Sequence, residues 1–324
     1  MMGFALAARG LLCSAVLVAA ATVGQAQTYP SKPIRIILPY VPGGIIDTAG
    51  RNLALRLSES LGQSVVAENR PGAGGMVGAD VAARATPDGY TILLSDPALA
   101  SNPTLHTDVP YDLFKGLQTV SIVGSSPAVI VASLTLPVKT FAEFIAYAKA
   151  NPGKLNNGTP GLGSSSHLTG EMLKLASGIE MTHVPYAGLA PALTDLLAGH
   201  TDVMVANLDS SLAQVQEGKL KGLAVTGEKR APEVPDLPAI AETYPEVVST
   251  SWFAVVAPPK TPPEIAGKLS RAFAEILREP EVERKWREMS LTPVGGTPEE
   301  VGAFLKDETA RWRKVIVSGG IKRP

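Results

Sequence analysis

The sequence predicts an α/β protein built of two domains. Short apolar, β-branched runs alternate with segments of helical periodicity along most of the 324 residues, which is the pattern of parallel sheets with helical crossovers. The alternation occurs in two blocks of similar length, about 27–126 and 127–249, and each is long enough for a domain of its own. Hydrophobic residues make up 45% and charged residues 18% of the chain, a composition typical of a globular protein.

The first block begins with a β-branched strand and continues with a helix in which Leu53, Leu57 and Leu61 recur at helical spacing. The glycine-rich turn NRPGAGG leads into a helix of small residues, and PDG is a turn signal before the third strand. The expected elements are, in order, strand Ile34–Leu38, a helix from Asp47, strand Val65–Ala67, helix Met76–Ala85 and strand Tyr90–Ser95.

The second block repeats this alternation after Leu117. Thr140 is expected to cap a helix that the turn NPG closes, and GSSSH is expected to open the next helix. Strands are expected at Val120–Val123, Val129–Ala132, Leu155–Thr159, Met181–Tyr186, Val203–Ala206, Leu220–Thr226 and Trp252–Ala257, and helices at 140–149, after 163 and at Ala190–Ala198.

Three helices close the chain, at Glu264–Leu277, Pro280–Met289 and Pro298–Val317. They have no sheet of their own, so we expect them to return to the first domain. The predicted domains are therefore 27–126 together with 250–324, and 127–249. Two crossings between the domains would make a hinge available.

Residues 1–26 are predicted to be a secretory signal peptide. They contain one basic residue, Arg9, no acidic residue, and the uncharged run Leu11–Val23, which is shorter than the ~20 residues that cross a bilayer. We expect cleavage near Ala26; a membrane anchor is the less favoured interpretation. Cys13 is the only cysteine, and because Leu11 and Leu12 precede it in place of small residues, we do not expect lipidation. The mature chain would be exported, and in a bacterium periplasmic.

Charge and composition exclude several function classes. The net charge is −1, which gives no electrostatic reason to expect nucleic acid binding, and the 5% of aromatic residues leaves little for base stacking. The mature chain would lack cysteine and so needs no disulfide framework. We expect a monomer.

The sequence offers little evidence of a catalytic site. GxSxG, HExxH and GxxxxGK[ST] are absent, and the four histidines fit no metal-ligand spacing, so we expect neither a metal nor a cofactor. Ser164–Ser166 next to His167 superficially suggests a nucleophile with its base, but adjacent residues at a helix start more often cap that helix. The loop NRPGAGGMVG does not fit GxGxxG. We therefore do not expect an enzyme.

Three strand-to-helix loops are more informative: PYVPGGIID at 39–47, TPGLGSSSH at 159–167 and VANLDSS at 205–211. Each presents backbone N–H groups at a helix N-terminus, which favours an anion. Ligands of open α/β sheets bind beyond the carboxyl ends of the strands. Capping alone would explain one such loop, but three loops in a two-domain chain without catalytic groups favour a solute-binding cleft. In the first loop we interpret Asp47 mainly as the N-cap of its helix.

Several segments resemble one known family in the same order. They are YPSKPIRIILPYVPGGIID, ENRPGAGGMVGADVAARATPDGYTILL, NPGKLNNGTPGLGSSSHLTGEML, HVPYAGLAPALTDLLAGHTDVM and LAVTGEKRAPEVPDLPAIAE. Across nearly all of the chain from Tyr29 to about Gly320, the sequence is similar to the Bug-type extracytoplasmic solute receptors of tripartite tricarboxylate transporters.

The resemblance implies a two-domain periplasmic-binding-protein fold, type II-like, with a ligand cleft between the domains. It also implies a small carboxylate ligand, held by main-chain N–H groups and ordered waters, and delivery to the permease subunits of a tripartite tricarboxylate transporter. The residues expected to bind the ligand are Tyr40, Gly43, Gly44, Ile45, Ile46, Asp47, Asp96, Thr159, Gly163, Ser164, Ser165, His167, Tyr186, Ala187, Asn207 and Asp209.

Two departures from the family pattern indicate a more apolar cleft. HVPYAG carries Ala187 where the family often has lysine, and Ile45 and Ile46 stand where small or hydroxyl residues are often found. These changes favour a monocarboxylate with an apolar or aromatic body over citrate. The two isoleucines could instead turn into the core, which is the commoner fate of that residue.

Two other functions stay open at this point. A periplasmic sensor would use the same closure to dock on a signalling partner, so the sequence does not separate it from a transport receptor. A hydrolase is disfavoured because the catalytic constellation is missing.

Overall fold

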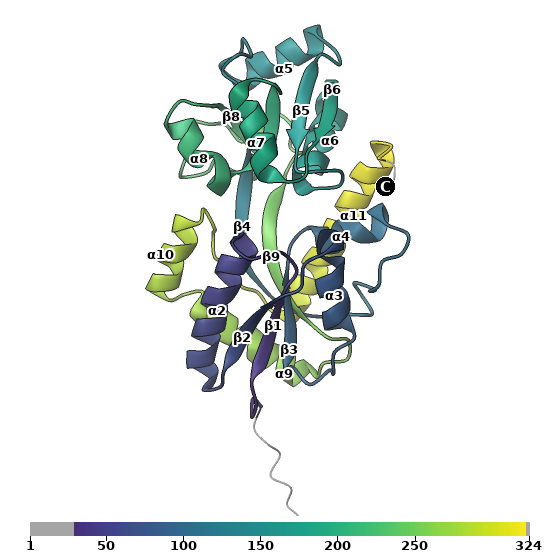
Figure 1. Ribbon diagram of the computed structural model, residues 1–324, viewed down its shortest axis with the longest axis vertical. Coiled ribbons are helices and arrows are strands. Elements are labelled where there is room, and N and C mark those ends of the chain that lie inside the picture. Colours follow the sequence, from purple (N-terminus) through teal and green to yellow (C-terminus); the bar gives the residue numbers. More distant parts are fainter. Residues whose placement is uncertain (1–28, 322–324) are drawn as a thin grey trace, which may run out of the picture.

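The computed structural model describes residues 29–321, so the predicted signal peptide and its cleavage near Ala26 lie outside the described residues. Two lobes lie along the long axis of the molecule (Figure 1). The strands are β1 (Ile34–Leu38), β2 (Val65–Asn69), β3 (Thr91–Ser95), β4 (Gln118–Ala132), β5 (Leu155–Thr159), β6 (Met181–Pro185), β7 (Val203–Asn207), β8 (Lys221–Val225) and β9 (Thr250–Ala257). The α-helices are α2 (Ile45–Leu61), α3 (Met76–Ala83), α4 (Ala98–Leu105), α5 (Phe141–Ala150), α6 (Ser165–Ser177), α7 (Leu189–Ala198), α8 (Leu208–Gln216), α9 (Pro263–Ile276), α10 (Pro280–Glu288) and α11 (Pro298–Ser318).

The strand order is β2-β1-β3-β9-β4-β7-β5-β6, and β8 pairs with β4 as well. β1 pairs in parallel with β2 and β3, and β5 pairs in parallel with β6 and β7. β4 and β9 pair antiparallel with each other and with their other neighbours. Each lobe is thus the expected αβ block with parallel strands, joined to antiparallel strands in the middle, and the predicted two-domain α/β fold is confirmed.

β4 and β9 are the strands that link the lobes (Figure 1). β4 pairs with β9 over 118–127 and with β7 over 128–132, so it changes partner in mid-strand. The sequence predicted two separate strands here, Val120–Val123 and Val129–Ala132, and that prediction is wrong. The polar segment between them stays extended because its backbone is paired with β9. The predicted domain boundary at 126/127 falls within this strand and stays a prediction.

Residues of β1 contribute to two different hydrophobic clusters, one on each face of the sheet. Ile34, Ile36 and Leu38 of β1 point to one face, where they pack with α2, α9 and α10. Ile37 points to the other face and joins a cluster that continues into the second lobe.

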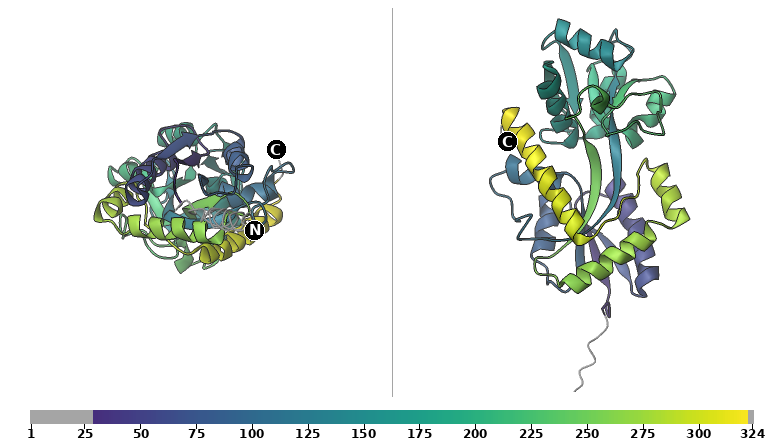
Figure 2. Two further views of the ribbon diagram at one scale, coloured as in Figure 1. Left: turned by 90° about the horizontal axis from the view of Figure 1, so that it is seen from below. Right: turned by 180° about the vertical axis from the view of Figure 1, so that it is seen from behind.

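α11 contributes to this second cluster because it packs on α4, on β4 and on α6. Seen from behind, it rises from the lower lobe toward the upper one (Figure 2). α9 packs on α2 and β4, as expected for a return to the first block, but α11 contacts elements of both lobes. α8 follows the strand-to-helix loop at 205–211, as expected, whereas α4 was not expected from the sequence.

Candidate functional site

Two adjoining cavities lie where the lobes face each other. The first cavity has a volume of about 360 Å³ and the second about 340 Å³, both within the range of about 300–1,000 Å³ that is usual for ligand pockets. Four residues line both cavities: Tyr40, Asp96, Pro97 and Ser165. The two cavities are therefore compartments of one cleft that meet at these residues.

The loop between β1 and α2 forms one wall of the second cavity. α2 begins at Ile45 with Gly44 as its N-cap, so the interpretation of Asp47 as the N-cap is wrong. Asp47 lies in the first turn, where it accepts hydrogen bonds from Gly43 N (3.0 Å), Asn69 Nδ2 (2.9 Å) and Arg51 Nε (3.0 Å). The hydrogen bond from Arg51 and those from Asn69 and Gly43 lower the pKa of Asp47 to about 2, against a smaller opposing effect of burial. Asp47 is thus an ionised anchor that holds the loop.

The N-terminus of α6 forms the opposite wall. Ser164 is the N-cap, and its Oγ accepts from His167 N at 3.3 Å. Ser165 lies in the first turn, where a backbone N–H has no intrahelical partner, and it lines both cavities. An anion in the cleft would meet this N–H and the positive end of the helix dipole.

The N-terminus of α8 is the third that reaches the cleft. Its N-cap, Asn207, lines the second cavity together with Ser251 and Phe253 of β9. The Oγ of Ser251 donates to Oδ1 of Asn207 at 3.2 Å, which engages the amide oxygen of this lining residue. Strand-to-helix turns from both lobes therefore converge on the second cavity.

Tyr40 and Asp96 form the boundary between the compartments. The hydroxyl of Tyr40 donates to both carboxyl oxygens of Asp96, at 2.9 and 3.0 Å, and Ala98 N donates to Oδ1 at 3.1 Å. Burial raises the pKa of Asp96, and burial together with Asp96 raises the pKa of Tyr40, which stays a neutral phenol. This pair fixes the loop after β1 against the start of α4.

His167 lies beneath the α6 loop and lines neither cavity. It is 3% exposed, its Nδ1 accepts from Gly163 N at 3.0 Å, and its ring stacks on His183 with centroids 3.8 Å apart. Burial, with a smaller effect of His183, lowers the pKa of His167 to about 3, so the ring is neutral. His167 therefore stabilises the loop before α6 and does not line the cleft, so the geometry favours the structural role.

The structure brings ten of the predicted ligand residues to the cavities: Tyr40, Gly44, Ile45, Ile46, Asp47, Asp96, Gly163, Ser164, Ser165 and Asn207. It places six elsewhere: Gly43, Thr159, His167, Tyr186, Ala187 and Asp209.

Most of these six have other roles. Thr159 is hydrogen bonded to His183 Nε2, and the Tyr186 hydroxyl donates to Asp195. Gly43 has a φ of +96°, a backbone conformation that favours glycine. A Cβ at this position would meet nothing within 4 Å, so the backbone conformation and not a close contact requires the glycine. Asp209 lies in the first turn of α8, where burial raises its pKa.

Both isoleucines line the second cavity, but they are not equivalent. Ile46 is buried in the core of the first lobe, whereas Ile45 is partly exposed at the cavity and packs on the edge of that core. The two alternatives for the isoleucines, wall and core, thus divide between neighbouring residues.

Sequence reasoning missed much of the first cavity. α4 supplies Ala98, Ser101, Asn102 and Leu105, its C-cap is His106, and α11 supplies Trp312. α4 gives no amphipathic periodicity and holds Pro103 inside it, so no helix was expected there. Trp312 is far from the other lining residues in sequence, and only the packing of α11 on α4 brings it to the cleft.

Cations are scarce at this site. Among residues 29–321, the side chains that line the two cavities include no lysine or arginine. The same residues contain no group of three or more His, Cys, Asp or Glu side chains placed to hold a metal ion. A search of the described helices for one with the length and apolar character to span a bilayer finds none.

Comparison with known proteins identifies the family. Residues 49–321 match the family described as "Tripartite tricarboxylate transporter family receptor". The chain belongs to this family. The chain is 39% identical over 300 residues to the protein BugT of Bordetella pertussis, covering 92% of each chain.

Two solved structures show the same fold. The first, R. palustris Rpa4515 with adipate, has a TM-score of 0.80 and 36% identity, over 91% of this chain and 99% of the other. The second, MatC from Rhodopseudomonas palustris with bound malate, has a TM-score of 0.75 and 28% identity, over 89% and 100%. Members of the tripartite tricarboxylate receptor family are periplasmic solute receptors rather than enzymes. The family match confirms the family predicted from the sequence, and the two solved structures confirm the predicted fold.

Proposed function

We propose that this chain is a periplasmic receptor that binds a small carboxylate in the cleft and delivers it to the permease of a tripartite tricarboxylate transporter. The observation that carries the proposal is the convergence of three helix N-termini, those of α2, α6 and α8, on one cavity without lysine or arginine. A carboxylate fits backbone N–H donors and helix dipoles, which supply partial positive charge without a cationic side chain. The adipate and malate in the two solved relatives support the same ligand class.

The first experiment is a thermal-shift screen of the mature protein against a carboxylate library. A ligand at 100 times its Kd stabilises the folded state by about 2.7 kcal/mol. For a protein of this size that corresponds to a rise in Tm of about 4 °C. The amide and methyl ester of each responding acid are the matched controls, because they keep the body of the ligand and remove its charge. If no carboxylate raises the Tm, or if the esters act as well as the acids, the proposal is wrong.

Delivery needs a separate measurement. Uptake of the labelled ligand by cells that contain or lack this protein tests the transport role, and we expect uptake to depend on it. Unchanged uptake with a lost transcriptional response to the same ligand would instead favour the sensor.

A further inference from the structure

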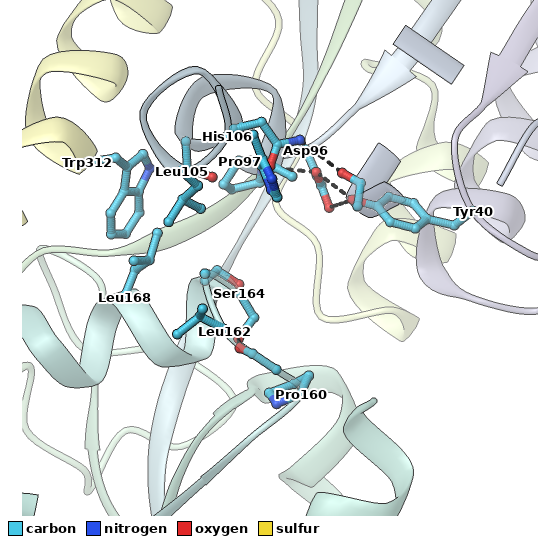
Figure 3. A pocket seen from close by; sticks show the side chains of 17 residues that line it. Tyr40, Asp96, Pro97, Leu105, His106, Pro160, Leu162, Ser164, Leu168 and Trp312 are labelled. Atoms are coloured by element: carbon cyan, nitrogen blue, oxygen red, sulfur yellow. Dashed lines mark hydrogen bonds between the residues drawn. The ribbon is translucent and has the colours of Figure 1, made fainter. Parts of the chain in front are cut away.

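The first cavity has a polar end and an apolar end (Figure 3). Tyr40 and Asp96 lie at one end, hydrogen bonded to each other, where this cavity meets the second one. Leu105, Leu168 and Trp312 gather at the other end, away from that pair. The helix N-termini of α2 and α8 line the second cavity alone, that of α6 lines both cavities, and that of α4 lines the first cavity at the Asp96 end.

The apolar end is built from three packed helices. Leu105 of α4, Leu168 of α6 and Trp312 of α11 are all nearly or fully buried, and α11 packs on both other helices. Such side chains keep one arrangement because their neighbours hold them, so the wall exists before a ligand enters. Leu162, in the loop before α6, lines the same cavity and is 45% exposed.

Resting on the proposed function, we propose that the first cavity is a tail subsite. It takes the apolar body of a ligand whose carboxylate is held in the second cavity by the N-termini of α2, α6 and α8. The ligand class is a monocarboxylate with an extended alkyl chain or an aryl group.

A second carboxylate is disfavoured in the first cavity for electrostatic reasons. At the apolar end it would lie among Leu105, Leu168 and Trp312, where the indole N–H of Trp312 is the one polar group of the three side chains. The described residues lining the cavity include the polar side chains of Ser101, Asn102 and His106 but no lysine or arginine to pair with a second carboxylate. Burying an unpaired charge costs several kcal/mol. Asp96 at the mouth of the subsite already has its oxygens engaged by Tyr40 and by Ala98 N, so it offers no free donor to a second carboxylate.

Isothermal titration calorimetry with butyrate, hexanoate, octanoate and adipate tests the subsite on the unmodified mature protein. Each additional buried methylene group should tighten binding by about fourfold, so the affinity should rise from butyrate to hexanoate. Hexanoate and adipate have the same carbon skeleton and differ in the second carboxylate. We expect hexanoate to bind at least about tenfold more tightly than adipate.

Two variants locate the effect in the first cavity. Leu162→Ser removes a partly exposed wall, and we expect it to weaken hexanoate and octanoate about three- to tenfold and butyrate hardly at all. Ala98→Leu places extra volume in the same cavity and should act in the same direction. Leu197→Ser is the matched control, because Leu197 is 42% exposed on α7 and lines neither cavity.

The outcomes separate the subsite from the function on which it rests. If butyrate binds but affinity does not depend on chain length, or if adipate binds as tightly as hexanoate, the tail subsite is wrong and the receptor function stands. If Leu162→Ser weakens long and short acids equally, the tail does not lie in this cavity. If none of the four acids binds and the thermal screen also finds no carboxylate, both proposals are wrong.

Discussion

Gly163, in the loop before α6, lies against Leu105 at the end of α4. Its φ is +76°, and a Cβ at this position would lie 2.5 Å from Cδ1 of Leu105. Real Cβ atoms do not approach so closely, so an alanine here requires Leu105 or the loop to move. Leu105 is 3% exposed and packed in the core, so its side chain can move only into the first cavity, which it lines. We expect Gly163→Ala to hinder the approach of the two walls of the cleft.

The cost of Gly163→Ala has two parts that one control separates. An alanine at a left-handed φ costs about 1–2 kcal/mol, which lowers the Tm by a few degrees. Gly178, the C-cap of α6, has a φ of +70°, and a Cβ there would meet nothing within 4 Å. Gly178→Ala therefore carries the backbone cost alone. The contact with Leu105 adds about 1–3 kcal/mol of overpacking, which the protein relieves by opening the cleft.

If the cleft opens to relieve the contact with Leu105, the packing cost appears as a loss of ligand affinity. A closed state made 1–3 kcal/mol less favourable weakens binding by about five- to 150-fold, since every 1.4 kcal/mol is a factor of ten. Calorimetry with the most stabilising carboxylate of the screen should show this loss for Gly163→Ala and not for Gly178→Ala. In a Leu105→Ala background the effect of Gly163→Ala should shrink to that of the control. Equal losses in both glycine variants, or an undiminished loss in the Leu105→Ala background, would refute the reasoning.

Three further predictions concern the walls of the second cavity. Asp47→Asn should lower the free energy of unfolding at neutral pH, measured from urea unfolding curves. Because the folded-state pKa of Asp47 is depressed from 3.8 to about 2, the difference from wild type should vanish as the pH falls from 4 to 2, and a pH-independent difference would contradict the role of Asp47 as an ionised anchor of the loop. Ser165→Pro removes one N–H at the first position of α6, where proline is tolerated and Ser164 already has an extended ψ of 155°, so ligand affinity should fall while the Tm changes by less than about 2 °C; unchanged affinity counts against this wall. Ile45→Thr should alter the preference between aromatic and short carboxylates in calorimetry at little cost in Tm, whereas Ile46→Thr should lower the Tm by several degrees because Ile46 is in the core; the reverse pattern would contradict the division between them.

The elements that the sequence predicted well are those in which local pattern and tertiary environment agree. The run Ile34–Leu38 is a strand with the bounds expected from the sequence, and Thr140 caps its helix by accepting from Glu143 N. β4 was divided in two because Gly124 and Pro127 are breakers in isolation, but a long antiparallel partner supplies hydrogen bonds along that stretch. Pairing with a strand more than a hundred residues away leaves no local signal.

The site likewise has a part that local sequence patterns predict and a part that depends on packing between distant segments. Strand-to-helix loops carry a local signature, so Ser164, Ser165 and Asn207 could be placed at the cleft from the residues alone. The apolar end of the first cavity could not, because Leu105 and Trp312 are ordinary core-forming residues until α11 folds back over α4. A sequence pattern thus located the part of the site that suits a carboxylate, and only packing revealed the part that would distinguish one carboxylate from another.

Asp47 shows how a correct motif can carry an incorrect role. An acidic residue after PGG fits an N-cap, yet a side chain in the N-cap position would occupy the N–H groups that an anionic ligand needs. With Gly44 as N-cap, no side chain caps α2, and Asp47 in the first turn accepts from Gly43 N, from Arg51 one turn further along the same helix and from Asn69 of β2. The carboxylate therefore holds the loop from behind while the first-turn N–H groups stay open toward the cavity. Its negative charge does not repel the ligand strongly because Arg51 pairs with it, and this pairing allows an acidic residue to stand beside an anion site.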